Sequence, residues 1–315
     1  MKRKAVVVIG PTASGKTALG VHIAEKFNGE VISADSMQIY KGMNVATAKP
    51  TVEEMHGIKH HLIDFLDVDD TYSVSAFCED ANRVFDDIYN RGKLPVIVGG
   101  TGLYVDSFLT NTTFLDNASS DEVRVALKKE LDENGAEFMY SKLKKVDSDA
   151  AEKIHPNNTV RVLRALEVFV STGKTISEQT AMSHETESDI EPLYIGITFN
   201  DREKLYERIN RRVDLMLTMG LEDEAREFFN SNPSKTAVNA IGCKELKPYF
   251  DGEKSLNECV EDLKKSTRHY AKRQLTWFRK NENINWVYPD DYENQEDMLK
   301  DVFEIIKEFL KENKQ

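Results

Sequence analysis

Short apolar runs alternate with longer segments of helical spacing along much of the chain. The run Ala5–Ile9 is unbroken and rich in valine, as is typical of a strand buried in a parallel sheet. This alternation predicts an α/β fold with a parallel sheet flanked by helices. Further strands are predicted at residues 30–33, 60–64, 94–98, 192–198 and 284–288, and helices at 16–27, 75–91, 204–219, 221–230, 256–280 and 298–311.

Residues 118–173 interrupt this alternation, because their apolar positions follow helical spacing throughout. We therefore expect an all-helical insertion domain, residues 117–191, within a core formed by residues 1–116 and 192–315. A length of 315 residues suits such an arrangement, at ~100–200 residues per domain. Residues 178–191 contain five acidic residues and no Lys or Arg, which predicts a solvated loop.

Composition narrows the class of protein. A 40% hydrophobic, 30% charged chain is typical of a soluble, folded protein, and no apolar run approaches the ~18 residues of a membrane span. The N-terminal basic residues lead into a run of only strand length with no cleavage site, so they do not predict a secretion signal. The three cysteines, Cys78, Cys243 and Cys259, are too far apart for a disulfide framework or a CxxC zinc site, and they fit a reducing cytoplasm.

Charge gives two opposing indications. The formal net charge of −12 by itself argues against nucleic-acid binding. Residues 261–280, however, hold seven basic residues against two acidic ones, a net charge of +5, and end near Trp277 and Phe278. A basic helix with terminal aromatic residues is a plausible platform for a nucleic-acid stem, although such a helix is often only a solvated face.

A phosphate-binding motif follows the first predicted strand and precedes the first predicted helix. The sequence Gly-Pro-Thr-Ala-Ser-Gly-Lys-Thr fits the pattern G-x-x-x-x-G-K-[ST]. Backbone N–H groups of such a loop cradle a diphosphate, Lys16 adds a positive charge, and Thr17 can bind Mg²⁺. The candidate diphosphate-binding residues are Gly10, Pro11, Thr12, Ala13, Ser14, Gly15, Lys16 and Thr17. The motif alone leaves kinases, ATPases, GTPases and other diphosphate users open.

Two further polar segments follow predicted strands. Asp35-Ser-Met-Gln-Ile-Tyr-Lys41 comes after the second strand, and Gly99-Gly-Thr-Gly-Leu-Tyr104 after a later one. Both are therefore expected at the carboxyl edge of the sheet, where open α/β sheets bind ligands. The chain has no guanine-reading N-K-x-D sequence, and the second segment is not an apolar-Asp Walker B strand. These features argue against an ordinary nucleotide hydrolase.

Together these motifs resemble the bacterial tRNA dimethylallyltransferases. The resemblance covers nearly the whole chain in the family's order and includes Thr47-Ala-Lys-Pro50, His60-His-Leu62, Arg161–Glu167, Ile241–Leu246 and Thr267–Arg279. It implies a P-loop core with a helical insertion. It also implies transfer of a dimethylallyl group from dimethylallyl diphosphate to N6 of the adenosine just 3′ of a tRNA anticodon, with release of diphosphate. The expected enzyme is a cytoplasmic monomer that uses Mg²⁺ and needs no membrane and no obligate protein partner.

The resemblance also implies catalytic roles. Asp35 resembles the family's general base, which an adenine amine needs because its lone pair is delocalised. Lys16, Thr101 and Arg208 resemble the groups that neutralise the leaving diphosphate, with Mg²⁺ on Thr17. Asp35 as a helix cap or a Mg²⁺ ligand stays open, as does the choice between Arg208 and Arg212 for the diphosphate contact.

Residues implied in tRNA binding lie in both predicted domains. In the family, Gln38 reads the flipped target base, and an amide can make two hydrogen bonds to an adenine edge. Met37 and Tyr40 suit either the core or a prenyl channel. The implied tRNA-binding residues are Asp35, Ser36, Met37, Gln38, Thr101, Arg124, Thr159, Arg161 and Arg164. Ala46 departs from the family, which usually has Gly there, and we expect at most an altered turn.

Two other function classes remain at this stage. One is a P-loop small-molecule kinase that uses ATP, and the other is a nucleic-acid-binding module with a degenerate nucleotide site. The sequence does not decide whether ATP binds in the loop, which tRNAs are modified or which substrate binds first.

Overall fold

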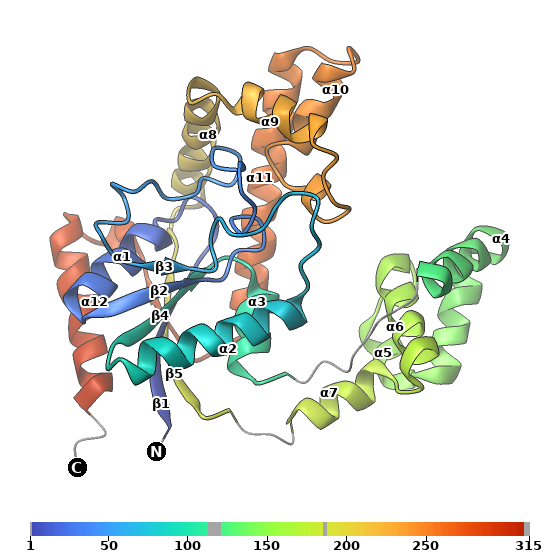
Figure 1. Cartoon of the computed structure of the whole chain (residues 1–315), viewed down its shortest axis with the longest axis horizontal. Helices are drawn as coiled ribbons and strands as arrows, with labels where there is room; N and C mark the ends of the chain where they lie inside the picture. The colour runs from blue at the N-terminus through green and yellow to red at the C-terminus, as the bar shows by residue number, and fades with distance from the viewer. Residues whose placement is uncertain (1, 113–120, 185–187, 312–315) are drawn as a thin grey trace. The chain divides into compact units, whose positions relative to one another are not determined.

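The computed structural model describes residues 2–112, 121–184 and 188–311, which form two compact units (Figure 1). Unit 1 comprises Met1–Leu109 and Asp189–Gln315, and unit 2 comprises Thr110–Ser188. The predicted domain junction at residues 116 and 117 lies outside the described residues, as does the predicted start of the helical stretch at 118. Within the described residues, no helix is both long enough and apolar enough to cross a bilayer.

Unit 1 is built on a six-stranded parallel sheet with the order β3-β2-β4-β1-β5-β6, which confirms the predicted fold class. The strands are β1 (Arg3–Ile9), β2 (Gly29–Ser33), β3 (His60–His61), β4 (Leu94–Gly99), β5 (Ile190–Ile197) and β6 (Ile284–Val287). The strand predicted at 60–64 is shorter because Leu62 and Asp64 have left-handed φ angles of 58° and 56°.

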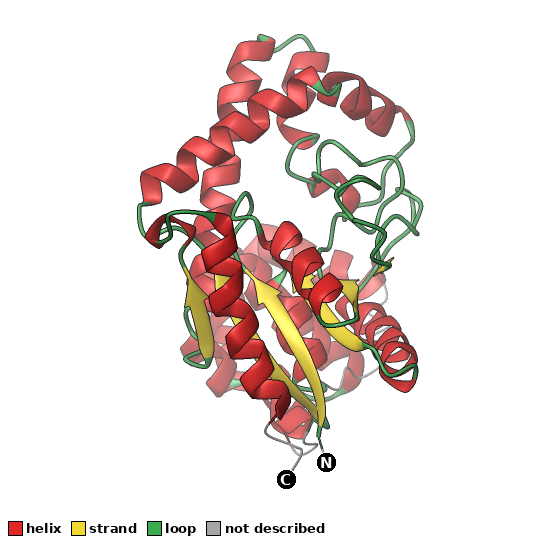
Figure 2. Ribbon diagram, turned by 90° about the vertical axis from the view of Figure 1, so that its left-hand side faces the viewer, coloured by secondary structure: helices red, strands yellow, loops and turns green. Residues whose placement is uncertain are grey.

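Helices cover both faces of the sheet (Figure 2). Alternate residues of β1, such as Val6 and Val8, pack with α1 (Lys16–Lys26) and α12 (Gln295–Lys311) in one buried cluster. On the opposite face lie α2 (Val74–Asn90) and α3 (Gly102–Leu109), which contribute buried phenylalanines. Burial on both faces explains why the strands are continuous apolar runs.

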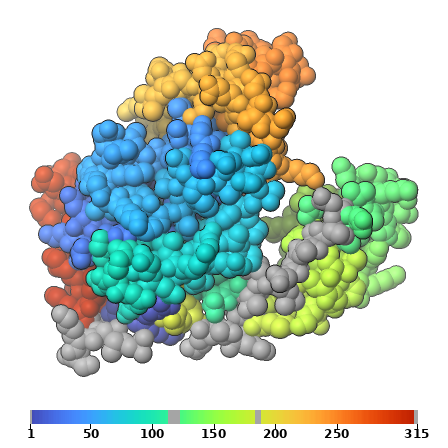
Figure 3. Space-filling model, viewed as in Figure 1, coloured from blue at the N-terminus to red at the C-terminus, as the bar shows by residue number. Residues whose placement is uncertain are grey.

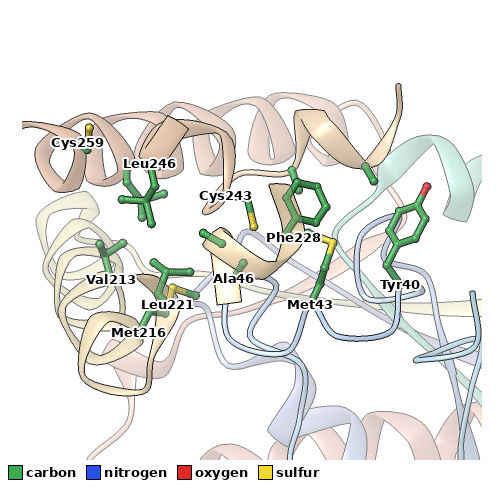
Figure 4. Packing of buried hydrophobic residues seen from close by; sticks show 14 of the residues in the cluster. Tyr40, Met43, Ala46, Val213, Met216, Leu221, Phe228, Cys243, Leu246 and Cys259 are labelled. Atoms are coloured by element: carbon green, nitrogen blue, oxygen red, sulfur yellow. The ribbon is translucent and has the colours of Figure 1, made fainter. Parts of the chain in front are cut away.

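A second helical layer of unit 1 packs against the segment that follows β2 (Figure 4). It contains α8 (Arg202–Thr218), α9 (Leu221–Asn230), α10 (Lys247–Phe250) and α11 (Leu256–Phe278). Tyr40, Met43 and Ala46 are buried in its apolar cluster. Figure 3 shows the same segment, in blue, on the surface beside the residues coloured yellow and orange. Tyr40 therefore belongs to the core, which resolves one alternative left open by the sequence.

The described residues of unit 2 form helices joined by short turns, with no strand among them. It contains α4 (Asp121–Val146), α5 (Ser148–Lys153), α6 (Thr159–Thr172) and α7 (Ile176–His184), around a small apolar core. The solvated loop predicted at 178–191 is wrong over α7. Thr175 N–H donates to the Glu178 carboxylate at 2.7 Å, and Glu178 N–H donates to the Thr175 hydroxyl at 3.1 Å. This reciprocal capping pair begins a helix, so Glu178 is a capping residue.

The edge of the sheet is held by one buried carboxylate. Glu30 on β2 is 3% exposed and accepts hydrogen bonds from Arg91 (2.6 and 2.7 Å) and Lys93 (2.7 Å). His61 on β3 lies 2.8 Å from the same carboxylate, so this histidine has a structural role between the two strands. The bidentate bonds from Arg91, helped by Lys93 and His61, hold the pKa of Glu30 far below its usual range.

Replacing this carboxylate should therefore be costly. We expect Glu30→Gln to lower the free energy of unfolding at pH 7 by about 3 kcal/mol, because it removes the buried charge on which the half-buried Arg91 and Lys93 converge. A depressed carboxyl pKa stabilises the fold above the unfolded value and loses that effect as pH falls, so the difference should shrink below about pH 4. Urea unfolding measures both quantities. The exposed Glu304→Gln is a matched control that should change stability by less than ~0.5 kcal/mol, and an equally small change in Glu30→Gln would refute this role.

Candidate active site

The phosphate loop lies between β1 and α1, as the motif requires. Gly15 has a φ angle of 97°, which a side chain would strain, and it precedes the first residue of α1. A Cβ on Gly10 would lie 2.3 Å from the carbonyl oxygen of Ile197 on the neighbouring strand. Glycine is thus favoured at these two positions for separate steric reasons. The loop leads directly into the N-terminus of α1, where backbone N–H groups favour an anion.

The loop opens into a cavity of about 780 Å³ at the carboxyl edge of the sheet. Lys16 lines this cavity together with Asp35 and Arg212. Desolvation lowers the pKa of Lys16 to about 8, Asp35 opposes this shift, and Arg212 adds to it. Burial likewise lowers the pKa of Arg212 from its ordinary value, again opposed by Asp35. Two cations facing one carboxylate leave this end of the cavity with an excess of positive charge that favours an anion.

One buried amide joins the two glycine-rich loops. Gln274 on α11 is 5% exposed, and its Oε1 accepts from the backbone N–H of Thr12 at 2.8 Å. Its Nε2 donates to the carbonyl oxygen of Gly100 at 2.9 Å. A Cβ at Gly100 would lie 2.2 Å from that nitrogen, so the glycine permits the contact. Gln274 has no distinguishing signal of its own in the sequence, although it lies within the segment Thr267–Arg279 that carries part of the resemblance.

Asp35 lies two residues after the end of β2, and its two carboxylate oxygens have different surroundings. Its Oδ1 accepts from the backbone N–H groups of Met37 (2.9 Å) and Gln38 (3.3 Å), so it does cap the following turn. Both bonds end on Oδ1, and within the described residues Oδ2 makes no hydrogen bond. Thr101 is not among the residues that line the cavity. Its Oγ1 accepts from Ser36 N–H at 3.1 Å and lies 3.3 Å from the Ser36 hydroxyl. Thr101 thereby positions the turn that carries Asp35.

Both candidate arginines of α8 contact the phosphate loop. Arg208 donates from Nε to the carbonyl oxygen of Ala13 at 3.0 Å and lies over the Phe199 ring at 5.2 Å. Arg212 donates to the Thr12 hydroxyl at 3.1 Å. Both line the cavity, so the geometry gives each a route to a bound diphosphate.

Gln38 lines the cavity from the turn that follows β2. Its amide nitrogen lies 3.2 Å from the Thr47 carbonyl oxygen and 3.3 Å from that of Ala48, so both N–H groups are engaged. The carbonyl oxygen Oε1 remains to accept from a ligand, and a two-bond contact with adenine requires one N–H to leave its loop partner. The loop is in turn fixed by Glu224, which accepts from three consecutive backbone N–H groups, those of Asn44, Val45 and Ala46, each at 2.8 Å. Sequence reasoning missed Glu224.

Ala46 does not adopt a left-handed backbone conformation, so the turn does not require glycine at this position. Part of the cavity lining is apolar, and Met37 contributes to it together with Leu215, Met216, Met219, Ile241 and Leu263. Met37 thus belongs to the cavity wall, in contrast to Tyr40.

The remaining predicted residues lie in unit 2. Thr159 is the first residue of α6, and Arg161 is exposed on its first turn. Arg124 and Arg164 both pair with the buried Glu167, at 2.8 and 3.2 Å. These two arginines therefore have a structural task within the unit, whereas the Arg161 side chain faces solvent.

Oxygen donors suited to a hard cation also converge near the loop. A second cavity of about 20 Å³, the size of a water molecule, is lined by Thr17, Ser33 and Asp35. His60 lines it as well, and its buried Nε2 has no partner among the described residues. A hydroxyl and a carboxylate beside room for water form the kind of donor set that Mg²⁺ accepts.

A parallel sheet whose first strand leads into this phosphate loop defines a P-loop α/β protein. The chain matches the family model described as IPP transferase over residues 38–281. It is 47% identical over 304 residues to the tRNA dimethylallyltransferase of Thermoanaerobacter sp. (strain X514), covering 96% of each chain.

Solved structures give the same result. The tRNA delta(2)-isopentenylpyrophosphate transferase of Staphylococcus epidermidis is 43% identical, with a TM-score of 0.71 and coverage of 98% of this chain and 100% of that one. A eukaryotic dimethylallyltransferase acting on tRNA is 32% identical, with a TM-score of 0.78, 91% of this chain and 74% of that chain being covered. The chain belongs to the IPP transferase family, which confirms the resemblance drawn from its motifs.

The shifted pKa of Lys16 makes anion binding pH-dependent. Only the ammonium form attracts a diphosphate, so binding should weaken as pH rises through about 8. We expect affinity for inorganic diphosphate to fall between pH 7 and 9 by about tenfold more in the wild type than in Lys16→Arg, which stays charged. Titration calorimetry measures this ratio, and ionisation of diphosphate itself cancels between the two proteins. Parallel pH profiles would show that Lys16 does not control the site.

Proposed function

We propose that this protein transfers the dimethylallyl group of dimethylallyl diphosphate to N6 of the adenosine 3′-adjacent to the anticodon in tRNA, releasing diphosphate. The observation that carries this proposal is that the phosphate loop, the Asp35 carboxylate and an apolar wall all line one cavity. Phosphate-binding and apolar residues in one lining match the two parts of a prenyl diphosphate. Membership of a family whose relatives carry tRNA dimethylallyltransferase names supports the acceptor.

In the proposed step, the adenine N6 nitrogen forms a bond to C1 of the dimethylallyl group as the C1–O bond to diphosphate breaks. The bonding electron pair leaves with the diphosphate, and the N6 proton passes to Asp35. Oδ2 is the oxygen placed to accept it, because Oδ1 is held by backbone N–H groups. A positioned base of this kind contributes ~10²–10⁴-fold to rate.

The charge that develops on the leaving diphosphate faces the cationic end of the cavity. Lys16, Arg208 and Arg212 supply positive charge there, together with the loop N–H groups. The donor chemistry of Thr17 and Asp35 fits Mg²⁺, which when bound neutralises part of the diphosphate charge. Thr101 acts on Asp35 through Ser36, as a positioning residue.

Two surfaces suit the tRNA. Gln38 Oε1 can accept from an adenine amine once the base leaves its stack, which costs little in a single-stranded loop. The phosphate backbone suits exposed basic side chains, namely Arg161 on α6, Lys265 and Lys272 on α11, and Arg279 and Lys280 directly after α11. Three buried free cysteines fit a reducing compartment, so we place the enzyme in the cytoplasm.

A kinase reading has less support, because the relatives are named as tRNA-modifying transferases. The decisive assay incubates the protein with Mg²⁺, unmodified tRNA and dimethylallyl diphosphate labelled in the prenyl group. Label should enter tRNA, and map to the adenosine beside the anticodon. A parallel incubation with γ-labelled ATP should transfer nothing. Label entering a small molecule from ATP, or none entering tRNA, would refute the proposal.

Two substitutions at Asp35 distinguish the role of its capping oxygen from the role of the oxygen proposed to accept the proton. Asparagine keeps an oxygen that can cap the turn, whereas alanine removes both functions. We expect Asp35→Asn and Asp35→Ala each to lower kcat by about 10²-fold or more, while only Asp35→Ala also lowers thermal stability. Single-turnover kinetics and thermal melts provide the measurements. Near-normal turnover in Asp35→Asn would leave the carboxylate with the capping role alone.

A further inference from the structure

A cluster of two imidazoles and a carboxylate lies beside the phosphate loop and has no part in the proposed chemistry. His22 and Glu25 are one helical turn apart on α1, and His56 approaches them from the loop between β2 and β3. One ligand atom from each residue lies within 4.8 Å of the others. His22 and His56 also line the large cavity, so the cluster stands at its rim.

The geometry suits a tetrahedral metal ion. His22 Nδ1 lies 3.9 Å from Glu25 Oε2, and His56 Nδ1 lies 4.0 Å from the same oxygen. Ligands of a tetrahedral zinc ion lie about 3.3 Å apart, because each bond is about 2.0–2.1 Å long. Small movements of partly exposed side chains therefore close the site. The rings of His22 and His56 meet edge-on with centroids 5.9 Å apart, so neither ring stacks over the shared space.

The loop that carries His56 is held in place without a metal. Thr51 and Glu54 form a reciprocal pair, in which Thr51 N–H donates to the carboxylate at 2.9 Å and Glu54 N–H to the hydroxyl at 3.3 Å. Met55 and His56 N–H groups close successive turns on Thr51 and Glu53 carbonyl oxygens. The ligand is thus presented by an ordered segment, which lowers the entropic cost of binding.

An outer residue sets the orientation of the His22 ring. Gln295 of α12 lies with its Nε2 3.2 Å from His22 Nε2, and His22 Nδ1 faces Glu25. An amide nitrogen donates, so a metal ion at Nδ1 requires this amide to turn over and present Oε1, which then accepts the Nε2 proton.

We propose that His22, Glu25 and His56 form a binding site for a borderline divalent transition-metal ion of the Zn²⁺ type, which ties the loop 51–58 to α1. Two imidazoles and one carboxylate favour such ions over Mg²⁺, which prefers oxygen ligands. The site is distinct from the oxygen-lined cavity at Thr17, and it leaves a fourth position open. His22-x-x-Glu25 is visible in the sequence, but His56 joins it only through the fold.

Titration calorimetry of the full chain with ZnCl₂, in buffer containing millimolar Mg²⁺, tests the proposal. The wild type should bind one equivalent with micromolar or tighter affinity. His22→Gln and His56→Gln should each weaken binding by about 10–100-fold. His155→Gln in unit 2 is the matched control and should bind as the wild type does. Displacement of zinc by Mg²⁺, or equal binding in all three variants, would overturn the assignment.

Hydrogen exchange supplies a second readout that does not depend on activity. Zinc should slow amide exchange in residues 51–58 in the wild type and leave it unchanged in His56→Gln. Thermal melts without zinc check that this variant folds normally, since His56 is exposed and contributes little to the core. Unchanged exchange in the zinc-loaded wild type would contradict the tie between loop and helix.

Discussion

Two hydrogen bonds from one buried amide hold the catalytic edge of this protein together. Gln274 binds a phosphate-loop N–H with one end and the Gly100 carbonyl with the other, so α11 fixes the two loops that follow neighbouring strands. The turn after β2 is attached to the same assembly, because Thr101 binds Ser36. The positions of Lys16, Asp35 and the arginines of α8 relative to one another all depend on this frame.

The frame explains how a phosphate loop can serve alkyl transfer. Lys16 and Arg212 lose part of their hydration at the cavity, and Asp35 offsets that loss for both. A bound diphosphate brings further negative charge to these cations. Their electrostatic stabilisation of the diphosphate is therefore greatest when the leaving group is fully charged. The apolar part of the cavity lining has no role in phosphoryl transfer to a small acceptor, whereas the proposed prenyl transfer gives it one.

Much of this arrangement could be predicted from sequence, for identifiable reasons. A continuous apolar run such as Ala5–Ile9 indicates a strand that is buried on both faces. The phosphate loop is recognised by the fixed spacing of its glycines, lysine and threonine. The boundaries of some elements were harder to predict, because a few local residues decide them. β3 ends early because Leu62 has a left-handed φ angle, and α7 begins where Thr175 and Glu178 form a reciprocal capping pair. The capping pattern was present in the sequence but was outweighed by the acidic composition around it.

Contacts between distant segments could not be predicted at all. Glu224 lies about 180 residues from the backbone N–H groups it accepts from, and nothing in its own surroundings indicates that role. Gln274 is similar, since an amide within a basic amphipathic helix is ordinarily a surface residue. The Zn²⁺-type site has the same character, with two ligands one turn apart and the third supplied by the fold.

The account rests on one claim, that the phosphate loop holds a leaving diphosphate and that no phosphoryl group is transferred. Phosphorus NMR of a reaction with dimethylallyl diphosphate and an anticodon stem-loop, combined with mass spectrometry of the nucleosides, measures this directly. One diphosphate released for each adenosine prenylated at N6, with no orthophosphate, is the predicted result. Orthophosphate or a phosphorylated acceptor in place of the prenylated adenosine would contradict it.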